Sequence, residues 1–217
     1  MTPRLLALDL DGTIVADLST ISRRVRAALQ QAMARGVTIV LATGREYAVT
    51  ARFARRLKTN GPLICYQGGL VRDPRTGHTL LAHFIPADLS RRVIRFARAR
   101  KLPMLLYTAD NAFAELPTPL MRRTFRQAGA PFALVNNLLA VLNDDTLPLK
   151  FLFIQPEGES AAVYRLLQRA FGDALTVTQS HATMVETTPP GVSKGAALRA
   201  LAEHLGIPLS QTVAIGD

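Results

Sequence analysis

Two aspartates separated by one residue are the feature of this sequence with the clearest chemical meaning. Asp9 and Asp11 lie in the run Leu8-Asp9-Leu10-Asp11-Gly12-Thr13, directly after the apolar segment 4–8. If that segment is a buried strand of a parallel sheet, both carboxylates point into a crevice at its carboxyl end, and Gly12 allows the sharp turn that follows. Like charges this close repel, so a proton or cation must share the site, and Mg²⁺ suits ligands that are all oxygen. The alternative is a turn with helix-capping acids.

Three further segments carry groups that suit phosphate or metal binding. In Leu41-Ala42-Thr43-Gly44-Arg45, a hydroxyl beside a glycine amide at the start of a helix can hold phosphate oxygens, although Thr43 could equally be a helix cap. In Gly191-Val192-Ser193-Lys194-Gly195, Lys194 at a helix start is a candidate phosphate ligand, or else a solvated surface lysine. Asp217, in Ile215-Gly216-Asp217, could supply another metal carboxylate.

The apolar pattern predicts the elements that position these groups. Strands are expected at 4–8, 37–42 and 62–66, with helices up to residue 35 and over 46–57 between them. This alternation is typical of a parallel α/β sheet with right-handed crossovers. A new pattern begins near residue 84. Its expected helices lie at 87–100, 119–128 and 159–171, and its expected strands at 103–107, 112–116, 149–154, 175–178 and 183–187. A helix over 193–205 and a strand over 212–215 then resume the first pattern.

This order predicts one domain inserted into another. The fold class is therefore α/β, with a Rossmann-like parallel sheet core made of residues 1–83 and 187–217. The insertion, residues 84–186, is expected to be a self-contained α/β cap domain. Its proline and glycine-rich borders suit joints of defined direction.

Composition excludes several classes of protein. The 217 residues are 48% hydrophobic and 19% charged, which excludes a disordered or collagen-like chain. No segment is long and apolar enough for a membrane span or a secretory signal, and the single Cys65 cannot form an internal disulfide. These features indicate a cytoplasmic protein.

The net charge of +10 raises the question of a nucleic-acid partner. The basic residues are spread over several expected helices, no basic tail is present, and no RNA-binding motif accompanies them. We interpret the charge as a field that attracts small phosphorylated anions rather than nucleic acid.

Together, and in this order, these motifs resemble the haloacid dehalogenase (HAD) superfamily of phosphohydrolases. The matching residues are Asp9, Asp11, Gly12, Thr13, Thr43, Gly44, Arg45, Lys194 and Asp217. The long insertion before Lys194, and the runs Cys65-Tyr66-Gln67-Gly68-Gly69 and 185–195, resemble the Cof-type branch (subfamily IIB). The resemblance implies a Mg²⁺-dependent phosphatase acting on small phosphate monoesters such as sugar phosphates.

The resemblance also assigns roles. Asp9 would be the nucleophile that forms an aspartyl-phosphate, and Asp11 the general acid and base. Mg²⁺ would be held by the Asp9 carboxylate, the Asp11 carbonyl oxygen and Asp217. The transferring phosphoryl group would be held by Gly12, Thr43, Gly44 and Lys194. Arg45 and Gln67 would contact the substrate or the cap.

Two departures from the family and two alternative functions remain open at this point. The family usually has Asn where this chain has Gln67, and it continues beyond the position of Asp217 with another carboxylate or amide, a strand and a helix. We therefore expect the 217-residue chain to bind Mg²⁺ weakly. The alternative functions are a phosphotransferase or mutase that uses the same intermediate, and a non-catalytic basic binding protein on the same fold.

Overall fold

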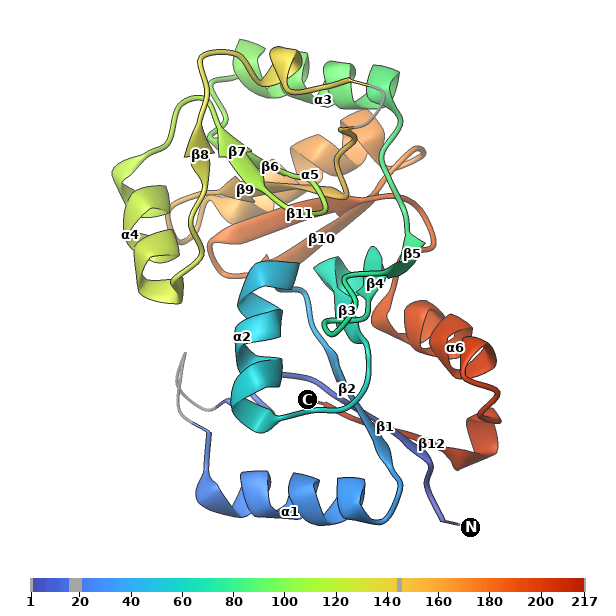
Figure 1. The fold of residues 1–217 in the computed structure, drawn as a ribbon. Helices are drawn as coiled ribbons and strands as arrows, with labels where there is room; N and C mark the ends of the chain where they lie inside the picture. The colour runs from blue at the N-terminus through green and yellow to red at the C-terminus, as the bar shows by residue number, and fades with distance from the viewer. Residues whose placement is uncertain (1, 16–20, 144–145, 217) are drawn as a thin grey trace. The chain divides into compact units, whose positions relative to one another are not determined.

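The computed structural model describes residues 2–15, 21–143 and 146–216. The chain divides into two compact units, Met1–Ala82 with Val192–Asp217, and His83–Gly191 (Figure 1). The sequence predicts the borders of the insertion at residues 84 and 186. In the structure the last strand of the second unit runs to Thr188 and the chain returns to the first unit after Gly191.

The first unit contains a mostly parallel sheet. Its strands, in spatial order, are β12 (Thr212–Ile215), β1 (Leu5–Leu8), β2 (Thr38–Ala42), β3 (Leu63–Cys65), β4 (Leu70–Arg72) and β5 (Thr79–Ala82). The four strands from β12 to β3 run parallel, with Leu5 opposite both Thr212 and Thr38. The expected parallel α/β core is thus confirmed. The antiparallel hairpin of β4 and β5 was not predicted from the sequence.

Helices cover both faces of this sheet (Figure 1). They are α1 (Arg23–Ala34), α2 (Tyr47–Leu57) and α6 (Lys194–His204). α1 and α2 lie together, because the Gln30 side chain of α1 donates a hydrogen bond of 2.8 Å to the Leu57 carbonyl of α2. On the opposite face, Ala197, Leu201 and Ala202 of α6 pack against inward-facing residues of β1 and β2. Burial of these apolar faces fixes where the strand ends and the first turn of α6 lie.

The second unit is an antiparallel sheet with helices of its own. Its strands, in spatial order, are β10 (Thr176–His181), β11 (Met184–Thr188), β9 (Lys150–Ile154), β6 (Met104–Tyr107), β7 (Ala112–Ala114) and β8 (Ala133–Leu134). Only the β7–β8 pair is parallel among the described strands of this sheet. Its helices are α3 (Ala87–Ala99), α4 (Pro119–Ala128) and α5 (Ser160–Phe171). α3 and α5 share one apolar cluster with β9, including an edge-to-face contact of Phe96 with Phe171.

Candidate functional site

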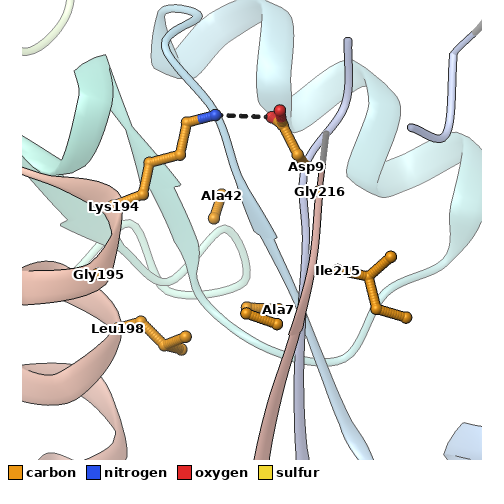
Figure 2. A pocket seen from close by; sticks show the side chains of 9 residues that line it. Ala7, Asp9, Ala42, Lys194, Gly195, Leu198, Ile215 and Gly216 are labelled. Carbon is orange, nitrogen blue, oxygen red and sulfur yellow. Dashed lines mark ion pairs between the residues drawn. The ribbon is translucent and has the colours of Figure 1, made fainter. Parts of the chain in front are cut away.

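Asp9 follows the last residue of β1 and is held from two directions. Its backbone N–H donates to the Ile215 carbonyl of β12 at 3.0 Å, so the strand pairing extends to the aspartate itself. One carboxylate oxygen, Oδ1, accepts hydrogen bonds from the Leu10 N–H at 2.8 Å and contacts Lys194 Nζ at 2.9 Å (Figure 2). Among the described residues no donor reaches the other oxygen, Oδ2. Asp9 is therefore anchored through one of its two carboxylate oxygens.

Lys194 reaches Asp9 from the first turn of α6. The Ser193 hydroxyl accepts the Ala196 N–H at 3.0 Å and caps the helix, which sets the starting position of the lysine stem. The side chains of Lys194 and Asp9 are 36% and 15% exposed, so the pair is neither dry nor freely solvated. The sequence leaves a solvated surface lysine open as the alternative; in the structure Lys194 is partly exposed and forms an ion pair with Asp9.

Asp11 is paired with an arginine from a different strand end. The Arg45 Nη2 atom lies 2.6 Å from Asp11 Oδ1 and its Nε atom 2.9 Å from Oδ2, a two-pronged contact. The turn between the two aspartates and α1 uses Gly12 with φ of 75°, a conformation that favours glycine. The neighbouring Thr13 is half-buried. The resemblance suggested that Arg45 contacts the substrate or the cap; in this structure it binds Asp11.

Thr43 and Gly44 follow β2 at the same edge of the sheet. The Thr43 side chain is fully buried, and its hydroxyl oxygen accepts the Arg45 N–H at 3.2 Å. Because that bond uses a lone pair, the hydroxyl proton is still able to point at another acceptor. Glu46, not Thr43, occupies the N-cap position of α2. The possibility that Thr43 serves as the helix cap is thereby excluded.

Gln67 lies against Gly44 from the turn after β3. A Cβ atom added to Gly44 would come within 2.8 Å of Gln67 Cδ and closer still to its Nε2. The structure therefore brings Gln67 beside the Thr43–Arg45 segment. Asp217, the remaining candidate, lies outside the described residues.

A cavity of about 300 Å³ opens beside Asp9 and Lys194 (Figure 2). Its other lining residues are Ala7, Ala42, Gly195, Leu198, Ala214, Ile215 and Gly216. Apart from the Asp9–Lys194 pair the walls are small or apolar side chains and glycine backbone. An ion pair at an apolar wall is less screened than one in open water, which strengthens its interaction with an added charged group.

The residues of the site offer oxygen ligands for a divalent cation. The Asp9 carboxylate and the Asp11 backbone carbonyl offer oxygen ligands, which fit Mg²⁺. No cluster of three or more His, Cys, Asp or Glu side chains occurs among the described residues, and Asp217, the further carboxylate that the resemblance implies, lies outside them. Burial raises the pKa of the nearby Cys65 thiol to about 12, which keeps the buried thiol protonated at neutral pH.

Residues 6–217 match the family of haloacid dehalogenase-like hydrolases. The chain belongs to this family. A Streptococcus pyogenes protein named as a phosphatase is 30% identical over all of this chain and 81% of its own length. The HMP-PP phosphatase of Yersinia pestis is 30% identical over 99% of this chain and 77% of its own. A solved structure from Thermotoga maritima superimposes with a TM-score of 0.87 at 26% identity, covering 100% of this chain and 80% of that one.

These comparisons confirm the resemblance stated from the motifs. The protein is a phosphatase of the HAD family with the expected α/β fold. None of the helices in the described part of the chain is long and apolar enough to cross a membrane.

Proposed function

We propose that this enzyme hydrolyses small phosphate monoesters through a phosphorylated Asp9, with Mg²⁺ as its cofactor. The observation that carries the proposal is the anchoring of Asp9. Its Oδ1 is held by the Leu10 N–H and by Lys194, while Oδ2 has no donor among the described residues. A carboxylate fixed in this way presents one oxygen in a constant direction, which is what nucleophilic attack in line with a leaving group requires.

In the first step an Asp9 oxygen forms a bond to phosphorus, and the bond from phosphorus to the ester oxygen breaks. Protonated Asp11 donates its proton to the departing alkoxide, which leaves as an alcohol. In the second step water attacks the same phosphorus and gives a proton to Asp11. The acyl–phosphate bond then breaks, so inorganic phosphate leaves and the Asp9 carboxylate is restored.

The neighbouring residues bind and orient the phosphoryl group. Lys194, which holds Asp9, would at the same time donate to a phosphoryl oxygen, because its ammonium group carries three N–H donors. Thr43 would donate its hydroxyl proton, and the segments at Gly12 and Gly44 would border the phosphoryl group, as the resemblance implies. Mg²⁺, held by Asp9, Asp11 and Asp217, would supply charge neutralisation for the phosphoryl oxygens.

The substrate class is also part of the proposal. The relatives named HMP-PP phosphatase support an ester of a small metabolite. The surplus of basic residues supports an anionic substrate, because a positive field raises its encounter rate. We take the unit His83–Gly191 to be the cap implied by the resemblance, with a role in selecting the leaving group.

The test is to trap the intermediate. The protein is mixed with p-nitrophenyl phosphate and Mg²⁺, quenched in acid within one turnover, digested, and examined by mass spectrometry. A phosphoryl group on Asp9, lost when Mg²⁺ is removed with EDTA and absent in Asp9→Asn, is the expected result. Turnover without any phosphorylated peptide, or appreciable turnover by folded Asp9→Asn, would refute the mechanism.

A further inference from the structure

The turn Tyr66–Gly68, which follows β3, has an unusual backbone. Tyr66 and Gln67 have φ values of 53° and 60°, and Gly68 has 102°. The left-handed region is energetically costly for residues other than glycine. Two successive residues keep this conformation only where their surroundings hold them in it. This strain occurs at the carboxyl edge of the sheet, directly beside the segment Thr43–Arg45, which we call the candidate phosphate loop.

Two backbone hydrogen bonds tie this turn to the phosphate loop. The Tyr66 N–H donates to the Arg45 carbonyl at 3.0 Å, and the Gln67 N–H donates to the Thr43 carbonyl at 3.2 Å. In a planar trans peptide the C=O of one residue and the N–H of the next point in opposite directions. By holding the Thr43 carbonyl, Gln67 therefore directs the Gly44 N–H away from the turn.

The Gln67 side chain makes a second contact with the same peptide. Its amide occupies the space where a side chain on Gly44 would begin, with Cδ 2.8 Å from an added Cβ. Among the described residues nothing forms a hydrogen bond with this amide, so its contact with Gly44 is one of packing. A packed amide group restrains the rotation of the Gly44 peptide, which glycine would otherwise allow freely.

We propose that Gln67 is a positioning residue: it fixes the Gly44 peptide in the orientation that binds the phosphoryl group. The inference rests on the proposed function for the identity of the ligand. It gives a reason for the strained backbone, because in this conformation both the Gln67 N–H and its side chain reach the Thr43–Arg45 segment. The same conformation also brings Gly68 against the start of α6, since its added Cβ would lie 2.6 Å from the Ser193 carbonyl carbon.

The experiment compares two glycine substitutions. Gln67→Gly removes the side chain and relieves the backbone strain of a residue with a φ of 60°. Lys58→Gly relieves the strain of a residue with a φ of 56°, at the exposed end of α2 and away from the site. A third variant, Gln67→Asn, keeps an amide on a residue that tolerates the left-handed region well. Each is measured for its melting temperature, for KM and kcat with p-nitrophenyl phosphate and Mg²⁺, and for the Kd of inorganic phosphate by calorimetry.

We expect Gln67→Gly to melt close to wild type but to weaken phosphate binding and raise KM by about tenfold, as misplacement of a binding group does. Gln67→Asn should remain within about threefold of wild type, and Lys58→Gly should bind phosphate as wild type does. Unchanged phosphate affinity in Gln67→Gly, an equal loss in Lys58→Gly, or no rescue by Asn would each overturn the proposal.

The two binding and turnover readouts separate this inference from the proposed function. A wild type that binds phosphate but does not hydrolyse the ester would refute the proposed function, and the ratio of phosphate affinities would still decide the role of Gln67. A wild type that binds no phosphate would overturn both.

Discussion

Arg45 donates hydrogen bonds to both carboxylate oxygens of Asp11, from Nη2 to Oδ1 at 2.6 Å and from Nε to Oδ2 at 2.9 Å. The two partners are unequal, because the arginine side chain is 15% exposed and the aspartate 54%. The guanidinium also lies 5.2 Å from the centre of the Phe53 ring, which helps to fix it. Such a half-exposed pair adds only about 0.5–1 kcal/mol to stability. Its consequence is geometric: a fixed arginine orients a carboxylate that would otherwise rotate freely.

If Arg45 orients Asp11, the proposed general acid, then Arg45→Met and Asp11→Asn both impair the same step, which is proton donation to the leaving group. On a sugar phosphate, whose alkoxide needs a proton, Asp11→Asn should lower kcat/KM by about 10²–10⁴-fold. Arg45→Met should lower it by about tenfold, and the double variant should be no worse than Asp11→Asn alone. On p-nitrophenyl phosphate, which has a better leaving group, all three losses should be smaller.

Arg56→Met is the matched control for that experiment. Arg56 lies over the same Phe53 ring at 5.7 Å, so its loss removes one positive charge and one ring contact in the same unit. It should leave the ratio of activities on the two substrates unchanged. If the losses of kcat/KM in Arg45→Met and Asp11→Asn multiplied in the double variant, this would contradict a positioning role of Arg45 toward Asp11.

A second prediction concerns Gly68, whose backbone touches the first turn of α6. A Cβ on Gly68 would collide with the Ser193 carbonyl group, a backbone contact that cannot yield without moving Lys194. Gly77 has a similar positive φ of 74°, and a Cβ there would meet nothing within 4 Å. Both alanine variants should lose about 1 kcal/mol from backbone strain. Only Gly68→Ala should also lower kcat/KM, by about 10- to 100-fold.

Urea unfolding and steady-state kinetics on the two alanine variants check this prediction. If Gly77→Ala lost as much activity as Gly68→Ala, the effect would come from strain in general and not from displacement of Lys194. Wild-type kcat/KM in Gly68→Ala would show that α6 can shift without consequence for Asp9.

The longer elements of the fold could be predicted from the sequence because burial imposes a visible period. β2 is a continuous apolar run, and α2 repeats Val49, Phe53 and Leu57 every four residues. The hairpin of β4 and β5 was missed because its strands are three and four residues long and β5 is only half-buried. Short strands are stabilised by their neighbours in the sheet, which a local pattern does not record.

The positions of the candidate site residues in the fold could be predicted to the same degree, and their roles stay predictions. Asp9, Asp11, Thr43 and Lys194 stand at strand ends or helix starts, and the topology brings such positions to one edge of a parallel sheet. The pairing of Arg45 with Asp11 was not predictable, because the two residues are 34 positions apart and the direction of each side chain depends on packing. The role inferred for Gln67 likewise depends on a left-handed backbone, for which a glutamine gives no signal.

The last prediction concerns Cys65, the buried residue that ends β3. Burial raises the pKa of its thiol to about 12, while a hydrogen bond with Thr50 and the charge of Arg72 act weakly in the opposite direction. In the unfolded chain the thiol ionises near pH 8.5. Because the folded pKa is the higher one, the contribution to stability is complete below about pH 8.5 and is lost as the pH rises toward 12. Between pH 7 and pH 10 the wild type should lose about 2 kcal/mol of unfolding free energy from this group.

Cys65→Ala and Cys65→Ser should be less stable at pH 7, by different amounts, yet both should lack this alkaline decline relative to wild type. Urea unfolding of the three proteins at pH 7, 8.5 and 10 measures it, and parallel declines in all three would show that ionisation of the Cys65 thiol does not govern alkaline stability.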